Sequence, residues 1–158
     1  MNDANMDLAV EVYDTICEAL DIKEWRYDKN DSDLLVRFGV RGDDITMSFY
    51  IKVDAERQLI RLSSPLPFDM SFSGRVESSV AVCVASYGMC DGSFDYDHSD
   101  ATISFRMAAS FRNSFIGVEL IQYLIDCSCT MVDKYYREFL ALETGSMSIS
   151  DFIAKHSG

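Results

Sequence analysis

Residues 45–53, with the sequence ITMSFYIKV, alternate between apolar and polar side chains over their whole length. A period of two is the period of a β-strand, because successive side chains point to opposite faces of the sheet. One face of this segment is apolar, and the other carries hydroxyl groups and a lysine. The pattern therefore predicts an antiparallel strand with one face buried and the other in water.

The segments on either side extend this strand into an antiparallel meander. Residues 34–40, LLVRFGV, precede it across the turn RGDD, and residues 58–64, QLIRLSS, follow it across the turn DAER. We expect Pro65 and Pro67 to end the third strand, because proline has no N–H to donate to a sheet ladder. Alternation around residues 24–28 allows one extra short strand before the meander.

Three segments have the three- and four-residue apolar spacing of amphipathic helices. The first runs to about Leu20, and the last begins near Gly117 and is stopped by Gly145. The middle helix runs from about Ser73 to Met89. We expect its buried stripe to contain the residues Val76, Val80, Val84 and Tyr87. The corresponding stripe of the last helix consists of Ile121, Ile125, Val132, Tyr135, Tyr136, Phe139 and Leu142.

Between the last two helices, residues 91–108 read DGSFDYDHSDATISFRMA and predict a β-hairpin. Phe94 and Tyr96 alternate with aspartates, and HSDA forms the turn. The density of aspartates also suggests a calcium loop, but an EF-hand needs glycine at position six and glutamate at position twelve. Here glycine is second and no glutamate follows. We therefore place the aspartates on the solvent face and in the turn.

Together these elements predict an α+β fold, with helices packed on an antiparallel sheet and the element order α-β-β-β-α-β-β-α. We expect residues 1–145 to form a single domain. Residues 146–158 are expected to be a short C-terminal helix, capped by Ser148 or Ser150, or a mobile tail.

Charge and cysteine content limit the partners and the compartment. The chain has 14 Lys and Arg against 26 Asp and Glu, a net charge of −12. Such a charge repels phosphate backbones and anionic lipids, so we expect neither nucleic acid nor membrane as a partner. The acidic N-terminus lacks the features of a secretory signal, which favours a cytoplasmic location. The cysteines expected to be reduced core thiols are Cys17, Cys83, Cys90, Cys127 and Cys129.

The hairpin GSFDYDHSDATISFRM and the helical segment VDKYYREFLAL resemble the YbjN family, described as bacterial sensory transduction regulators. The shared pattern is a G-S/A-F hairpin with an acidic turn, an I-x-F/Y-R strand, and a closing helix with an aspartate and aromatics. It covers residues 73–142 well and the first half by element order alone. This chain has ASYGMCDG at residues 85–92, where the family tends to have an asparagine-bearing segment, so no role of that asparagine is carried over.

The resemblance implies the fold that the YbjN family shares with the type III secretion chaperones. It also implies a small dimeric cytosolic protein that binds or chaperones another protein. No family-wide catalytic residue accompanies this expectation.

Residues of the kinds used in catalysis do not form a recognisable motif. His98 lies in a predicted turn and His156 lies two residues from the C-terminus, so we expect both to be exposed and apart. Cys127 and Cys129 lie two positions apart on a predicted helix, where side chains point about 200° away from each other. Neither a redox motif nor a zinc motif fits them, and we expect buried or half-buried thiols. We therefore predict no enzyme activity, no cofactor and no metal.

Aromatic residues exceed what one sheet face and three helix stripes easily cover, with 10 Phe, 8 Tyr and 1 Trp. Tyr50, Tyr123 and one of Tyr135 and Tyr136 fall outside the core stripes, and Arg106 lies on the outer face of the predicted hairpin. Exposed tyrosine and arginine are typical of protein interfaces. We therefore expect Tyr50, Arg106, Tyr123 and Tyr136 to bind a partner.

Two functions are compatible with these observations. The first is a non-enzymatic protein-binding or chaperone-like regulatory module of the bacterial cytosol, acting as a homodimer. The alternative is a small-ligand sensor or enzyme with a pocket between the sheet and the last helix. A deep polar cavity with clustered carboxylates would favour the alternative, and a filled core would favour the protein-binding module.

Overall fold

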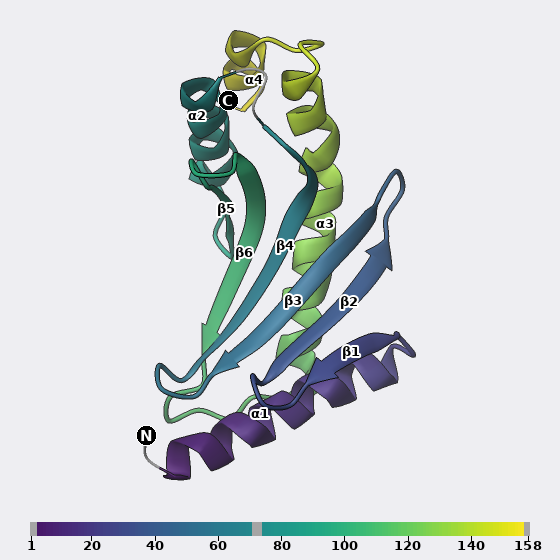
Figure 1. The fold of residues 1–158 in the computed structure, drawn as a ribbon, viewed down its shortest axis with the longest axis vertical. Coiled ribbons are helices and arrows are strands. Elements are labelled where there is room, and N and C mark those ends of the chain that lie inside the picture. Colours follow the sequence, from purple (N-terminus) through teal and green to yellow (C-terminus); the bar gives the residue numbers. More distant parts are fainter. Residues whose placement is uncertain (1–2, 71–73, 157–158) are drawn as a thin grey trace.

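The computed structural model of the chain describes residues 3–70 and 74–156 (Figure 1). Within these residues, helices accompany a six-stranded antiparallel sheet, which confirms the predicted α+β class. The elements are, in chain order, α1 (Asp3–Ile22), β1 (Tyr27–Asn30), β2 (Leu35–Arg41), β3 (Thr46–Asp54), β4 (Leu59–Asp69), α2 (Arg75–Tyr87), β5 (Ser93–Tyr96), β6 (Thr102–Ser110), α3 (Val118–Glu143) and α4 (Ile149–His156). Strand β1 is the extra short strand that the sequence allowed.

The strands lie in the order β1-β2-β3-β4-β6-β5, and every neighbouring pair is antiparallel. β1 to β4 form the predicted meander, and the β5–β6 hairpin joins the sheet through β6, which pairs with β4. The sheet therefore places strands from both halves of the chain side by side (Figure 1).

One face of the sheet forms the hydrophobic core. On β3 the predicted alternation is confirmed, because the buried residues are Met47, Phe49, Ile51 and Val53. α3 runs along this face behind the strands, and α1 crosses one end of the sheet (Figure 1). None of the described helices crosses the opposite side of β2, β3 and β4, which we call the open face of the sheet.

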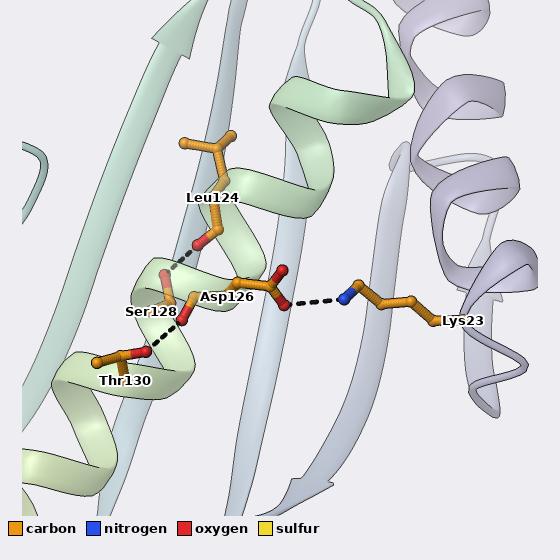
Figure 2. Close-up of polar contacts among 5 residues, drawn as sticks. All are labelled: Lys23, Leu124, Asp126, Ser128 and Thr130. Atoms are coloured by element: carbon orange, nitrogen blue, oxygen red, sulfur yellow. Dashed lines mark hydrogen bonds and ion pairs between the residues drawn. The ribbon is translucent and has the colours of Figure 1, made fainter.

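α1 is joined to α3 by an ion pair as well as by apolar packing. Lys23, which follows α1, places its Nζ 2.9 Å from Oδ1 of Asp126 on α3 (Figure 2). The hydroxyls of Ser128 and Thr130 donate to the carbonyl oxygens of Leu124 and Asp126, at 2.7 and 2.9 Å. The buried Ser128 is thus hydrogen-bonded within its own helix, as serines in helix interiors often are.

The prediction that Pro65 and Pro67 end the third strand is wrong, because β4 continues through both prolines to Asp69. β4 pairs with β3 only between Leu59 and Ser63, and beyond Ser63 it pairs with β6 alone. This part of β4 therefore has one free edge, where a residue without an N–H is tolerated. The register of β4 with β6 is irregular between Pro65 and Asp69.

α2 is a helix, as predicted, but it buries a different face. Its buried residues are Ser78, Ala81, Val82 and Ala85. These mostly small side chains let α2 lie against the edge strand β5, where Ser86 Oγ accepts the Phe94 N–H at 2.9 Å and donates to the Phe94 carbonyl at 3.2 Å. Covering a sheet edge in this way satisfies backbone groups that would otherwise be free to pair with another strand. The predicted start at Ser73 lies outside the described residues.

The segment after Gly145 contains the helix α4, which packs against α2 and α3. Ser148 is its cap, because Ser148 Oγ accepts the N–H of Asp151 at 3.1 Å. Phe152 has no exposed surface. His156, which we expected to be exposed, is half-buried. Whether residues 1–145 form a domain without this helix stays a prediction.

Candidate functional site

The open face of the sheet carries a row of cross-strand neighbours. Arg37 on β2 is opposite Tyr50 on β3, Tyr50 is opposite Ser63 on β4, and Ser63 is opposite Arg106 on β6. Arg37, Tyr50 and Arg106 are exposed. The fold therefore brings two of the predicted partner-binding residues, Tyr50 and Arg106, onto one surface although they are far apart in sequence.

The row contains two contacts that hold its cations in place. Arg106 forms an ion pair with Asp95 on the neighbouring strand β5. The guanidinium carbon of Arg37 lies 6.0 Å from the ring centroid of Tyr50. A guanidinium above an aromatic ring is attracted by the electron-rich face of the ring. The Arg37 and Tyr50 side chains thus support each other on an otherwise solvated surface.

Two hollows adjoin this row. A hollow of about 380 Å³ lies beside Tyr50, where Gly39 contributes no side chain. An open groove of about 680 Å³ lies between α2 and the β5–β6 hairpin and is lined in part by Ser79, His98 and Arg106. Open grooves of this kind suit a chain segment better than an enclosed small molecule, which pockets surround on most sides.

α2 presents a second surface. Its exposed residues Val76, Val80, Cys83 and Tyr87, which we call the α2 stripe, follow one another at spacings of four, three and four. Val76 is 75% exposed and Tyr87 is 92% exposed. This spacing is the spacing of the contact positions between paired helices. The sequence assigned Val76, Val80, Val84 and Tyr87 to the core, and this prediction is wrong for Val76, Val80 and Tyr87, which are exposed. Val84 is half-buried against the core.

The two other predicted residues lie on α3, away from the open face. Tyr123 is 49% exposed, and a hydrogen bond to Asp91 raises the pKa of its hydroxyl. Tyr136 is half-buried, and its ring packs edge-on against Phe68 with the centroids 5.8 Å apart. The four predicted residues therefore do not form one surface, because α3 covers the core side of the sheet and Tyr50 and Arg106 are on the other side.

His98 is exposed, as expected, and lies next to a serine. Ser79 Oγ is 2.9 Å from His98 Nε2, and the same hydroxyl lies 2.8 Å from the Arg75 carbonyl oxygen one turn earlier on α2. A serine hydroxyl that donates to its own helix has no proton left to give a base. Ser79 is therefore hydrogen-bonded like other serines inside helices, and its hydroxyl does not donate to a base as the hydroxyl of an activated nucleophile does.

The cysteines fall into three groups, of which the first is Cys17, a buried thiol as predicted. Cys127 and Cys129 are half-buried, as predicted, and burial raises the pKa of both thiols, in Cys129 to about 11. A raised pKa keeps a thiol protonated and weakens it as a nucleophile. Cys83 and Cys90 are exposed, which corrects the expectation that all five are core thiols. The exposure of Cys83 follows from the orientation of α2, whose buried side faces β5, and Cys90 lies in the segment between α2 and β5.

The aspartates of the hairpin turn serve the turn itself. Asp97 Oδ1 accepts the backbone N–H and the hydroxyl of Ser99, at 2.7 and 2.6 Å. Asp100 Oδ1 accepts the corresponding two groups of Thr102, at 3.0 and 2.7 Å. The hydrogen bonds from Ser99 lower the pKa of Asp97. Short polar side chains that bond to backbone two residues ahead are typical of turns.

The space between the sheet and α3 is filled by aromatic rings. Phe94 packs edge-on against Phe105, Tyr135 and Phe139, with centroids between 5.0 and 5.3 Å apart. A smaller hollow of about 340 Å³ lies where the end of α2 meets α3. Of the described residues that line it, Asp91 supplies the carboxylate. The aromatic packing favours the protein-binding module, while this hollow, lined by Phe105 of β6 and by residues of α3, is the place where the alternative small ligand would bind.

No protein-family model matches the chain, and no curated protein matches it. Solved structures do match. A chain in the crystal structure of the ExsC–ExsE complex has a TM-score of 0.61 at 12% identity, over 82% of this chain and 94% of that chain. The crystal structure of YbjN from E. coli gives 0.60 at 11% identity, over 82% and 91%. A chain in the HopA1–SchA chaperone–effector complex gives 0.58 at 10% identity, over 87% and 98%.

The fold is that of YbjN and the type III secretion chaperones. This result confirms the fold expected from the sequence resemblance. At these identities the similarity establishes the fold alone, and the residues of the open face and of the α2 stripe carry the functional argument. Among the described residues, no helix combines the length and the apolar character needed to cross a bilayer.

Proposed function

We propose that this protein is a non-enzymatic, chaperone-like protein-binding module of the bacterial cytosol, with a regulatory role and a homodimeric state. The α2 stripe carries the proposal. It is an uncharged surface, rich in valine and tyrosine, on a chain with a net charge of −12. Exposed apolar surface of this kind typically marks a site where another protein binds. The occurrence of the same fold in a chaperone–effector complex supports the same class of function.

A second copy of the chain is the partner that we assign to the α2 stripe. Two acidic chains repel each other, so self-association is favoured at a surface whose own contact residues carry no charge, as in this stripe. Two copies of α2 crossing antiparallel about a twofold axis would place Val80 next to Cys83 of the second copy and Val76 next to its Tyr87. Such an interface is self-complementary, as twofold symmetry requires.

Sedimentation equilibrium tests the homodimer. The wild-type chain should sediment as a dimer, and the double variant Val76→Ser with Tyr87→Ser should sediment as a monomer that still unfolds cooperatively. Phe115→Ser is a matched control, because Phe115 is also 92% exposed but lies before α3. In a Cys90→Ser background, a short bis-maleimide should link Cys83 to Cys83 of the second copy. A wild-type chain that remains monomeric at all concentrations would exclude the dimer.

Capture of a client tests the protein-binding function. We expect the tagged wild-type chain to retain a specific protein from a bacterial lysate, identified by mass spectrometry. The purified client should then bind with a measurable dissociation constant by calorimetry. Absence of any saturable protein ligand would contradict the proposed function. In that case the hollow between α2 and α3 would become the site to test with small molecules.

A further inference from the structure

The open face of the sheet concentrates positive charge on an acidic chain. One exposed basic residue from each of four adjacent strands, namely Arg37, Lys52, Arg61 and Arg106, makes up what we call the cationic sheet face. Neighbouring strands lie about 4.8 Å apart, so the face extends about 14 Å from the strand of Arg37 to that of Arg106. The protein thus carries a positive surface while its net charge is −12.

The charges of this face are only partly neutralised by the protein itself. Arg61 is 3.5 Å from Asp54, and Arg106 is paired with Asp95. Asp28 on β1 is the exposed cross-strand neighbour of Arg37. Among the described residues, however, neither Arg37 nor Lys52 takes part in an ion pair.

The position of Lys52 adds to the excess of positive charge that the protein leaves unpaired on this face. Lys52 is the direct cross-strand neighbour of Arg61, and like charges placed opposite each other destabilise a sheet. An anion bound between Lys52 and Arg61 would relieve that repulsion. The charges of Arg37 and Lys52 are therefore available to an acidic partner.

We infer that the cationic sheet face binds an acidic, extended segment of a partner protein, an inference that rests on the protein-binding function proposed above. Side chains on one side of an extended segment recur every second residue, about 6.8 Å apart, which is close to the spacing between rows of the sheet. Carboxylates at that spacing can reach Lys52 and Arg61 in one row and Arg37 in the next. Arginine adds two parallel hydrogen bonds to a carboxylate.

The surroundings of Tyr50 can accommodate the residues that lie between the carboxylates of the partner segment. The hollow of about 380 Å³ beside Tyr50 has room for an apolar or aromatic side chain. Tyr50 is 38% exposed, and its ring is already oriented under Arg37. A segment in which acidic and apolar residues alternate would therefore contact both the cations and the ring. Aromatic side chains with little conformational freedom are good anchors at such interfaces.

The size of the face favours a peptide over a nucleic acid. At physiological salt a charge acts over about 8 Å, so a short segment on the face is attracted by nearby cations and screened from distant acids. Duplex DNA carries a charge about every 1.7 Å along its axis, and a strand long enough to bind tightly would extend onto the acidic surface around the face. Its repulsion from that surface would offset the attraction.

Fluorescence anisotropy with a labelled peptide of alternating glutamate and leucine tests the inference on the full-length protein. The wild-type chain should bind this peptide, and added salt should weaken the binding. Arg37→Gln with Lys52→Gln should weaken binding by about five- to tenfold, since each exposed charge contributes modestly. Arg112→Gln with Lys134→Gln makes the same change in net charge elsewhere on the surface and should change the affinity less than about twofold.

Each other outcome overturns the inference. If the two double variants weaken binding equally, the peptide responds to net charge alone. If a lysine–leucine peptide binds more tightly, the acidic surface is the binding surface. If a single-stranded oligonucleotide binds more tightly through Arg37 and Lys52, the face belongs to a nucleic acid. If the protein dimerises and retains its client but ignores the acidic peptide, this inference fails and the proposed function stands. Loss of client binding altogether would instead remove the proposed function.

Discussion

Glu138 is a carboxylate on the buried side of α3, and it holds the last turn of α4. Lys155 Nζ lies 2.8 Å from Glu138 Oε1, and His156 Nε2 lies 2.5 Å from Glu138 Oε2. Burial would raise the pKa of this carboxyl, but hydrogen bonds from Lys155 and His156 outweigh that effect and lower the pKa below 4.5. The ionised form of Glu138 is therefore part of the folded structure.

This geometry predicts a pH-dependent stability contribution. Because the folded-state pKa is lowered, ionised Glu138 stabilises the fold above the unfolded-state value of 4.5, and the contribution is lost as the pH falls through the folded-state pKa. Glu138→Gln should lower the free energy of unfolding by about 1–3 kcal/mol at pH 7, the usual cost of losing hydrogen bonds to a charged group. Urea denaturation of the wild type and of Glu138→Gln, at pH 7 and at lower pH, measures the difference in free energy of unfolding and its dependence on pH.

The deficit of Glu138→Gln should shrink below pH 4.5, where the wild-type carboxyl also becomes protonated. Glu56→Gln changes an exposed carboxylate in the turn before β4 and serves as the control. A deficit for Glu138→Gln that stays constant across the acidic range would show that the ion pairs to α4 are not formed in solution.

At the scale of elements, the passage from α2 into the β5–β6 hairpin depends on a close backbone approach. A Cβ at Gly92 would lie 2.8 Å from the Arg106 carbonyl oxygen and 2.5 Å from Phe105 Cζ, whereas a Cβ at Gly88 meets nothing within 4 Å. Gly92→Ala should therefore destabilise the protein by about 1–3 kcal/mol, the usual cost of overpacking. Gly88→Ala should be neutral or slightly stabilising, since it restricts the unfolded chain. Thermal and urea denaturation of both variants would reveal the difference, and equal effects would contradict the described turn.

The elements themselves were largely predictable, because their signals are local. The alternation on β3 and the stop of α3 at Gly145, which has a φ of 73°, both depend on residues next to each other in the sequence. The end of β4 was not predictable, because a proline is tolerated only where a neighbouring strand is absent, and strand neighbours are a property of the whole sheet.

The buried face of α2 was not predictable for the same reason. Neither was the way in which the predicted partner-binding residues group on the surface. The exposed side of α2 carries Val76 and Val80, and its buried side consists mostly of small residues. The helix sequence alone does not indicate which of these sides lies against β5. The local alternation predicts, separately for each strand, that Tyr50 and Arg106 face outward. Their alignment through Ser63 follows from β6 pairing with β4, which no local pattern contains.

At the scale of the whole molecule, the cationic sheet face and the α2 stripe lie on different elements and adjoin at the groove that Cys83 and Arg106 help to line. The cationic sheet face occupies the open side of β2, β3, β4 and β6, while the uncharged α2 stripe lies on the helix beside β5. If the α2 stripe binds a second copy and the cationic sheet face binds a client, as proposed, both partners could bind at the same time. A dimer through α2 would carry two cationic sheet faces, so a client with two acidic segments would gain affinity by binding both.

The contribution of α4 to the whole fold is tested by a chain that ends at Gly145. This chain should still unfold cooperatively if residues 1–145 form a domain, but its free energy of unfolding should be lower by about 3–5 kcal/mol, the usual cost of emptying a buried phenylalanine site. The reason is that Phe152 is fully buried, with its ring 5.9 Å from that of Phe139. Full-length Phe152→Ala should account for most of the loss in urea denaturation. Unchanged stability of the shortened chain would mean that the C-terminal residues are a mobile tail, and failure to fold would mean that α4 is an integral part of the domain.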